Sequence, residues 1–186
     1  MNILIRNLQQ GDFDIYKKCY SNTEFKKFMY GNKKIDIDDC FLKMLENARD
    51  NRESYVVFYS TDEQTTKYNI VGFCNFLKYD KYPFEVSRET FAINGGLLPS
   101  LFNKGIGIYS CVSILSLFFH KHPDSDLYAS TFEDNIRSSK MLTAVGFEQL
   151  NQTWFQKNHF ILDKRRFSCC NFSTHLLSRV NITLEE

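Results

Sequence analysis

The sequence has almost no excess of charge of either sign. Its 186 residues include 23 Lys and Arg against 22 Asp and Glu, so the formal net charge is +1. Proteins that bind nucleic acids or anionic membrane surfaces usually carry a clear basic excess. We therefore expect neither a nucleic-acid partner nor a membrane partner for this chain.

Long hydrophobic runs are also missing. The longest apolar region, residues 106–119, is interrupted by serines and is too short to span a bilayer. The first six residues form a short strand-like run without the long apolar core of a signal peptide. Because no secretory signal is expected, the predicted location is cytoplasmic.

Metal-ligand spacing is absent from the cysteines. The six of them are scattered at positions 19, 40, 74, 111, 169 and 170, and most fall inside apolar patterns. Such placement favours reduced, buried thiols over a metal site or a disulfide framework. No internal repeat or linker divides the chain, whose length fits one domain with a substantial core.

Apolar periodicity gives a coarse map of the elements. It predicts strands over residues 2–8, 55–60, 68–79, 90–98, 126–132, 148–157 and 159–167, and helices near 12–20, 36–50, 105–120 and 137–145. Residues 25–30 continue the first helix or form a second turn, and both readings stay open. Residues 61–67 and 78–87 are polar loops, the last two strands join at Lys157-Asn158, and Gly72 marks a bulge or a close backbone contact.

The most informative stretch runs from Thr90 to His120. A predicted strand is followed by a turn at residues 99–104, and Gly105-Ile106-Gly107 then opens an apolar helix. The first N–H groups of a helix lack internal partners and the helix dipole favours anions there, while glycine lets phosphates approach the backbone. We therefore expect a pyrophosphate-bearing ligand at residues 103–108.

Two common phosphate motifs do not fit this stretch. No Gly-Lys-Ser/Thr follows with P-loop spacing, and the third glycine and the downstream acidic residue of the dinucleotide fingerprint are missing. Coenzyme A is the remaining common ligand of such a turn. Residues 102–107, FNKGIG, are similar to the Gln/Arg-x-x-Gly-x-Gly/Ala signature of the GNAT superfamily of N-acetyltransferases. Phe102 departs from the first position, and Lys104 is placed to supply the missing positive charge.

A second motif strengthens this resemblance. Residues 135–147, NIRSSKMLTAVGF, are similar to the Asn-x-x-Ser-x-x-x-Leu-x-x-x-Gly-Phe pattern of GNAT members that resemble ribosomal-protein N-terminal acetyltransferases. The resemblance covers residues 4–167 and implies an α+β fold. Its central sheet would be mixed but mostly antiparallel, with about seven strands flanked by helices and with the fourth and fifth strands splayed apart. Residues 1–167 would form the acetyltransferase domain, and residues 168–186 an extension whose role is open.

The resemblance also implies which residues bind acetyl-CoA. Backbone groups around the glycine turn would hold the diphosphate, the end of the fourth strand would hold the pantetheine, and the second motif would add side-chain contacts. An N–H of Leu97 or Leu98 would donate to the oxyanion. The predicted cofactor-binding residues are Leu97, Leu98, Asn103, Lys104, Gly105, Ile106, Gly107, Ile108, Asn135 and Ser138.

The catalytic candidates are Glu89 and Ser138. Many GNAT members use a glutamate of the fourth strand as general base, and strand alternation places Glu89 on the face of Leu97 unless a bulge intervenes. Glu85 is the second choice, Glu133 and Asp134 are further options, and a water chain is another. Where many relatives carry a proton-donating tyrosine, this chain has Leu142, so Ser138 becomes the candidate acid. For both candidates an ordinary surface role stays open, and Asn135 is equally a helix N-cap.

The function implied is acetyl transfer from acetyl-CoA to a primary amine by direct attack on the thioester. The acceptor is a small molecule or a peptide, with a protein N-terminus or an amino sugar favoured over a polyamine. A catalytically silent acyl-CoA-binding sensor or partner subunit is the alternative, because Phe102 and Leu142 both depart from the family pattern. A structural protein that binds no CoA is a third possibility, and a homodimer is left open as the assembly.

Overall fold

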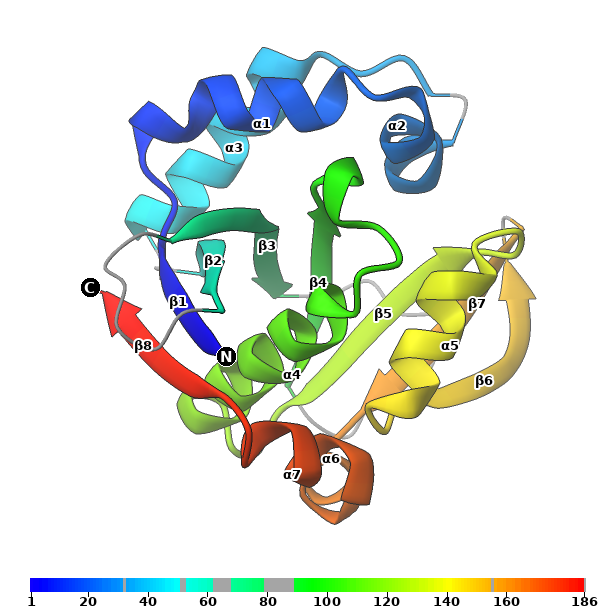
Figure 1. Ribbon diagram of the computed structural model, residues 1–186. Coiled ribbons are helices and arrows are strands. Elements are labelled where there is room, and N and C mark those ends of the chain that lie inside the picture. The colour runs from blue at the N-terminus through cyan, green and yellow to red at the C-terminus, as the bar shows by residue number, and fades with distance from the viewer. Residues whose placement is uncertain (32, 51–52, 62–67, 79–88, 155, 186) are drawn as a thin grey trace. The chain divides into compact units, whose positions relative to one another are not determined.

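The computed structural model describes residues 1–31, 33–50, 53–61, 68–78, 89–154 and 156–185 (Figure 1). Nearly all of the two predicted polar loops, and with them Glu85, lie outside the described residues. The elements follow in the order β1 (Asn2–Asn7), η1 (Gln10–Asp12), α1 (Phe13–Tyr20), α2 (Thr23–Tyr30), α3 (Ile37–Asp50), β2 (Ser54–Ser60), β3 (Asn69–Lys78), β4 (Thr90–Leu97), η2 (Pro99–Leu101), α4 (Ile106–Lys121), β5 (Asp126–Phe132), α5 (Ile136–Ala144), β6 (Glu148–Trp154), β7 (Lys157–Leu162), α6 (Lys164–Cys169), α7 (Asn171–Leu177) and β8 (Asn181–Glu185).

The strands form one mixed sheet in the order β6-β7-β5-β4-β3-β2-β1-β8. The pairs β1–β2, β2–β3, β5–β7 and β6–β7 are antiparallel, whereas β4–β5 and β1–β8 are parallel. The predicted α+β fold is thus confirmed. The sheet has eight strands instead of about seven, because the C-terminal segment adds β8.

The chain divides into two compact units. The first comprises residues 1–75, 95–110 and 180–186, and the second comprises residues 76–94 and 111–179. The strands β3 and β4 and the helix α4 contribute residues to both. Each unit has its own hydrophobic core.

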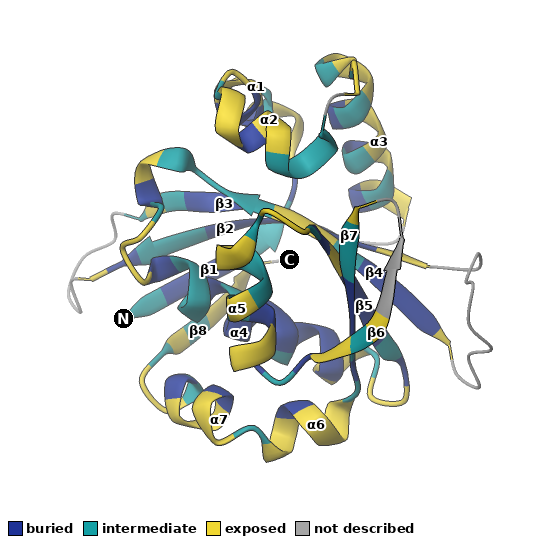
Figure 2. Cartoon of the chain, turned by 90° about the vertical axis from the view of Figure 1, so that its right-hand side faces the viewer, coloured by how far each residue is buried: buried dark blue, intermediate teal, exposed yellow. Residues whose placement is uncertain are grey.

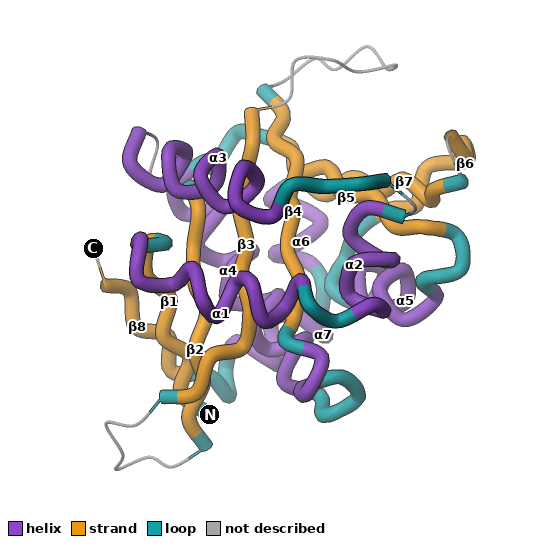
Figure 3. Tube along the Cα trace, turned by 90° about the horizontal axis from the view of Figure 1, so that it is seen from above, coloured by secondary structure: helices purple, strands orange, loops and turns teal. Residues whose placement is uncertain are grey.

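The core of the first unit lies between its helices and strands β1 to β3, as Figure 3 shows from above. Tyr16 and Cys19 of α1 recur at helical spacing and are fully buried, as are Phe41 and Leu45 of α3. A separate α2 begins where the Asn22 side chain accepts a hydrogen bond from the Phe25 N–H at 2.9 Å. Residues 25–30 thus belong to a separate helix, so neither alternative predicted for this segment is right.

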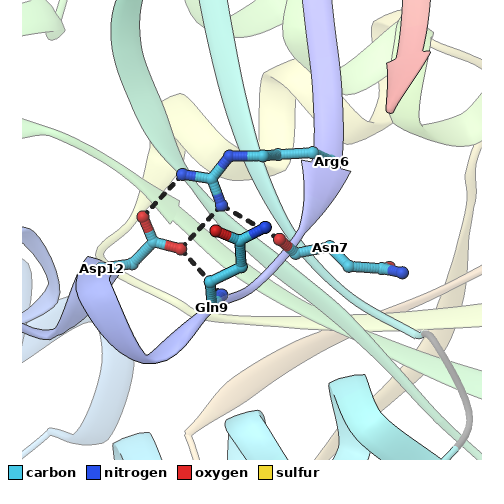
Figure 4. Close-up of polar contacts among 4 residues, drawn as sticks. All are labelled: Arg6, Asn7, Gln9 and Asp12. Carbon is cyan, nitrogen blue, oxygen red and sulfur yellow. Dashed lines mark hydrogen bonds and ion pairs between the residues drawn. The ribbon is translucent and has the colours of Figure 1, made fainter. Parts of the chain in front are cut away.

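An ion pair fixes the exit from β1 into η1 (Figure 4). Arg6 donates through both terminal nitrogens to the two carboxylate oxygens of Asp12, each at 2.8 Å, and Asp12 also accepts from the Gln9 N–H at 2.8 Å. The Asp12 side chain is only 5% exposed and that of Arg6 only 19%. The hydrogen bond to the Asp12 carboxylate raises the pKa of the Arg6 guanidinium. The pair therefore has the bidentate, partly buried geometry in which an ion pair matters for stability.

We expect Arg6→Met to lower the free energy of unfolding by about 2–3 kcal/mol, because it leaves the buried Asp12 carboxylate with only a backbone donor. Chemical denaturation measures this change. Lys43→Met is the matched control, since Lys43 pairs with Asp39 at 2.7 Å on the exposed face of α3. Its loss should leave the denaturation midpoint unchanged. Equal effects of the two substitutions would contradict the role given to Arg6.

The second unit buries the C-terminal part of α4. This helix is apolar all round, and Val112, Leu115 and Phe118 are fully buried. Phe118 packs against Phe76 of β3 and Phe91 of β4, with ring centroids 4.8 and 5.4 Å apart. Figure 2 shows this interior in dark blue and the outward faces of α5, α6 and α7 in yellow.

The C-terminal segment is an integral part of the fold. Asp163 caps α6 by accepting from the Arg166 N–H at 2.7 Å, and Phe167 stacks on Phe119 of α4 at 5.5 Å. In α7 the buried Ser173 hydroxyl donates to the Val145 carbonyl at 3.1 Å. The strand β8 then runs parallel to β1, with Asn181 opposite Asn2.

Two sequence predictions about the last hairpin are wrong. The predicted strand over residues 159–167 ends at Leu162, because Asp163 starts a helix. Lys157 and Asn158 belong to β7 instead of forming the turn. Gln156, with φ of 58°, adopts the left-handed conformation just before β7 begins.

Candidate functional site

The glycine turn between β4 and α4 is held by backbone contacts within the first unit. The Leu98 N–H donates to the Val71 carbonyl at 2.8 Å. The Phe102 N–H donates to the Pro99 carbonyl at 3.2 Å, and the Lys104 N–H donates to the Leu101 carbonyl at 3.4 Å. Asn103 has a φ of 62°. These bonds fold residues 98–105 into a compact bend that delivers the chain to the N-terminus of α4.

Gly105 is the residue that keeps this bend open. Its φ of +75° lies in the left-handed region that side chains rarely adopt, and a Cβ at this position would meet nothing within 4 Å. Open space therefore lies directly beside the first turn of α4, where the N–H groups of a helix generally lack internal partners. The Ile108 N–H is an exception, since it donates to the Gly105 carbonyl at 3.4 Å. This arrangement fits an anionic group such as a diphosphate.

Gly107 has a different role from the one its motif suggests. A Cβ there would overlap Cδ1 of Leu97, so this glycine leaves room for the Leu97 side chain. The exposed Asn103 and Lys104 lie beside the open bend, Ile106 is buried, and Ile108 is half-buried. Phe102, which replaces the polar residue of the family motif, packs against the core of the first unit.

One predicted oxyanion donor is ruled out. The Leu98 N–H already donates to Val71, as described above, so it is not available to a ligand. That part of the prediction was wrong for Leu98, because the chain bends into η2 one residue earlier than expected. The Leu97 N–H stays a prediction.

Asn135 and Ser138 stand together at the start of α5, in the second unit. The Asn135 side chain accepts a hydrogen bond from the Ser138 N–H at 3.3 Å, which makes it the N-cap of this helix. Ser138 is half-buried, and its neighbour Ser139 shares a 2.7 Å hydrogen bond with Thr131 of β5. Leu142, at the place of the family's tyrosine, is buried and provides no proton donor.

Glu89 lies on the exposed surface just before β4. Its carboxylate pairs with Nζ of Lys78 at 2.6 Å and accepts from the Ser125 hydroxyl at 3.3 Å. The hydrogen bond from Lys78 lowers the pKa of Glu89. A lower proton affinity makes a carboxylate a weaker base, so these contacts favour the structural role of Glu89 over the catalytic one.

The β4–β5 ladder is short. Pairing joins Thr90 to Asp126, Phe91 to Leu127 and Ala92 to Tyr128, although β4 extends to Leu97 and β5 to Phe132. By contrast, β5 pairs with β7 from Leu127 to Phe132. The ladder between the two parallel strands thus ends at the Ala92–Tyr128 pair.

The structure adds a buried contact that sequence analysis did not assign. The Tyr128 hydroxyl and Nδ1 of His159 share a hydrogen bond between β5 and β7. Both residues are buried, and their rings are nearly parallel with centroids 5.8 Å apart. Sequence could not reveal this pair, because the two residues lie 31 positions apart and meet only through the register between β5 and β7.

Within the described part of the chain, no three His, Cys, Asp or Glu side chains gather as a metal ion would require. Over the same residues, no helix combines the length and apolar character needed to cross a bilayer. All six cysteines are free, and burial raises the pKa of Cys19 to about 12.

Comparison with known proteins points to one family. The model of the acetyltransferase (GNAT) domain matches residues 2–148, whereas no curated protein sequence matches significantly. Among solved structures, spermidine N-acetyltransferase from Vibrio cholerae in complex with CoA and spermine is 13% identical at a TM-score of 0.70, over 89% of this chain and 98% of that one.

Two further solved structures have a similar fold. Aminoglycoside acetyltransferase AAC(6')-Ib in complex with coenzyme A is 14% identical at a TM-score of 0.69, over 89% of this chain and 97% of that one. Ribosomal-protein-alanine N-acetyltransferase from Brucella melitensis is 16% identical at a TM-score of 0.59, over 84% of this chain and 96% of that one. The family match covers most of the chain and includes both motifs and the glycine bend, so this protein belongs to the GNAT acetyltransferase family.

Proposed function

We propose that the protein is an acetyl-CoA-dependent N-acetyltransferase that acetylates a primary amine. The observation that carries this proposal is the bend at Gly105, where a left-handed glycine leaves open space beside the N-terminus of α4. Family membership supports the same conclusion, as do the structural relatives whose names describe acetylation of spermidine, aminoglycosides and a ribosomal protein.

The residues of the bend suit a diphosphate. Gly105 provides the opening, the first N–H groups of α4 provide donors and the positive end of the helix dipole, and the exposed Lys104 provides a positive charge. A carboxylate in the first turn of α4 would repel the ligand, and α4 has none there. Residues 103–108 would therefore hold the diphosphate.

Bound acetyl-CoA would supply an acyl group activated as a thioester. In our proposal the Leu97 N–H stabilises the negative charge that develops on the carbonyl oxygen, and Asn135 contacts the pantetheine arm. Ser138 provides a hydroxyl as proton donor or cofactor contact. Its backbone N–H is fixed by Asn135, so the two residues would act together.

The acceptor in this proposal is a primary amine on a small molecule or a peptide. A protein N-terminus and an amino sugar are the two candidates drawn from the Asn-x-x-Ser motif. The near-neutral charge of the chain gives no feature that would attract a polyamine specifically.

The competing function is a silent acyl-CoA-binding module. The buried Leu142 and the core-packed Phe102 favour it, because each replaces a polar group of the family pattern. Release of free thiol from acetyl-CoA, measured against a panel of peptide N-termini, amino sugars, aminoglycosides and polyamines, separates the two. Amine-dependent thiol release supports the enzyme, whereas CoA binding without turnover on any amine supports the module.

We expect Ser138→Ala to lower kcat by about tenfold to a hundredfold while changing the Kd of CoA less than twofold, because a proton donor acts mainly in the transition state. Steady-state kinetics and calorimetry measure the two quantities. Thr143→Ala is the control, since Thr143 is an exposed hydroxyl on the same helix that donates to the Ser139 carbonyl. Wild-type kcat in Ser138→Ala would remove this serine from the mechanism.

A further inference from the structure

We propose that Tyr128 and His159 form a proton relay that deprotonates the amine acceptor, with Tyr128 in contact with the amine and His159 acting through Tyr128. This inference rests on the proposed acetyltransferase function and adds the base that the function requires. It is carried by the hydrogen bond between the two residues, their burial, and their position in the sheet.

The two side chains lie on one face of the second unit's strands. Tyr128 and Ser130 are two residues apart on β5, and His159 of β7 lies directly opposite Ser130, so all three point to the same side. Thr131 points to the other side, where its hydroxyl bonds Ser139 of α5. The relay therefore lies on the face that α5 does not cover.

The pair is sheltered but has solvent-exposed surface beside it. Tyr128 is 9% exposed and His159 only 7%, whereas Ser130 is exposed. A phenol and an imidazole that share a hydrogen bond in such surroundings are held in one relative orientation. A bound amine at Ser130 would thus meet an oriented hydroxyl oxygen instead of a mobile one.

The pair also marks the end of the ladder between β4 and β5. Tyr128 is the last residue of β5 that pairs with β4, through Ala92. The family resemblance implies that the pantetheine arm runs along β4 beyond the end of this ladder. The relay therefore lies at the end of the paired region, beside the strand that the thioester arm would follow.

The proton balance of the step is simple. A primary amine is mostly an ammonium at neutral pH and must lose one proton before its nitrogen can attack a carbonyl carbon. In the relay, an N–H bond of the ammonium breaks and its electron pair stays on nitrogen, while the proton forms a new O–H bond on Tyr128. The original Tyr128 proton moves to Nδ1 of His159. The products are a neutral amine, a neutral tyrosine and an imidazolium that later releases its proton to solvent.

Glu89 is the alternative base, and its geometry is less suitable. It is exposed, it is paired with Lys78, and its pKa is lowered by that contact. The relay instead uses an imidazole, the group that most often accepts protons in enzymes near neutral pH.

Two substitutions test the relay, with acetyl-CoA and the best amine of the panel as substrates. Tyr128→Phe keeps the ring and removes the hydroxyl, and His159→Gln keeps a polar partner but cannot store the proton. Each should lower kcat by about a hundredfold. The Kd of CoA should stay within twofold, and the double variant should be no slower than the slower single one. Thr131→Val is the control, because it removes a buried hydroxyl bond from the opposite face of the same strand and should keep wild-type kcat.

A second readout does not depend on turnover. In nitrogen NMR spectra, the Nδ1 resonance of His159 should shift when Tyr128 becomes Phe, because its hydrogen-bond partner is lost. If a variant fails to fold, fluorotyrosine at position 128 keeps the volume and increases the acidity of the phenol, so kcat should still change. Wild-type kcat in Tyr128→Phe, His159→Gln or the fluorotyrosine protein overturns the relay alone. Absence of turnover by the wild-type protein on every amine overturns the proposed function, and the relay with it.

Discussion

Gly105→Glu should reduce the affinity for CoA at least about a hundredfold, a loss of roughly 3 kcal/mol at about 1.4 kcal/mol per tenfold. The substituted side chain would enter the open space beside the first turn of α4, where nothing lies within 4 Å of the Cβ position. Its carboxylate would neutralise the helix N-terminus and repel a diphosphate. Isothermal calorimetry with CoA measures the change.

Gly105→Asn is the matched control. Any side chain at a φ of +75° is strained, but Asn tolerates this conformation better than most residues. Glu therefore carries the larger backbone cost, and the difference between the melting temperatures of the two variants measures it. With both proteins folded at the assay temperature, the difference in affinity reports on the charge and bulk of Glu. We expect Asn to weaken CoA binding tenfold or less. Wild-type affinity in Gly105→Glu would show that the bend does not hold the diphosphate.

Gly72→Ala should lower the free energy of unfolding by about 3 kcal/mol or more, the upper end of the range for overpacked positions. A Cβ on Gly72 would lie 3.0 Å from both the Gly96 carbonyl carbon and the Leu97 Cα, and closer still to the Gly96 oxygen. These are backbone atoms of β4, so no side chain can move aside. Chemical denaturation with a folded-state control by circular dichroism measures the effect.

Gly11→Ala provides the comparison for this substitution. Gly11 lies in η1, and an added Cβ there would meet nothing within 4 Å. Removing a glycine at an unstrained position usually stabilises a protein by about 0.4–1 kcal/mol through the unfolded state. If Gly72→Ala and Gly11→Ala unfold at the same denaturant concentration, the close approach of β3 and β4 at Gly72 is not real.

Local signals in the sequence explain which predictions succeeded. Asn135 caps α5 because a side-chain oxygen three residues before an N–H is a short-range interaction, and Gly146 ends that helix with a φ of +107°. The close contact expected at Gly72 is present for the same reason, since glycine within a strand marks a tight approach. Both motifs of the acetyltransferase family lie in these locally determined regions.

Most of the failures involve contacts between distant segments, whereas α6 begins at a local cap that the apolar pattern concealed. The apolar run Phe160-Ile161-Leu162 suggested a strand that continued to Phe167, yet the cap at Asp163 turned the chain into α6, where Phe167 packs on Phe119. Residues 181–185 pair with β1, at the opposite end of the chain. The ion pair between Glu89 and Lys78, and the bond between Tyr128 and His159, likewise depend on register between strands.

Amide chemical shifts test the central claim most directly, because they report on residues 103–108 without any substitution. Nitrogen-labelled protein is titrated with CoA and, separately, with pantetheine, which lacks the diphosphate. Our account predicts that CoA shifts the amide resonances of residues 103–108 in a saturable way and that pantetheine leaves them in place. Saturable CoA binding that leaves the amides around Gly105 unmoved would contradict it.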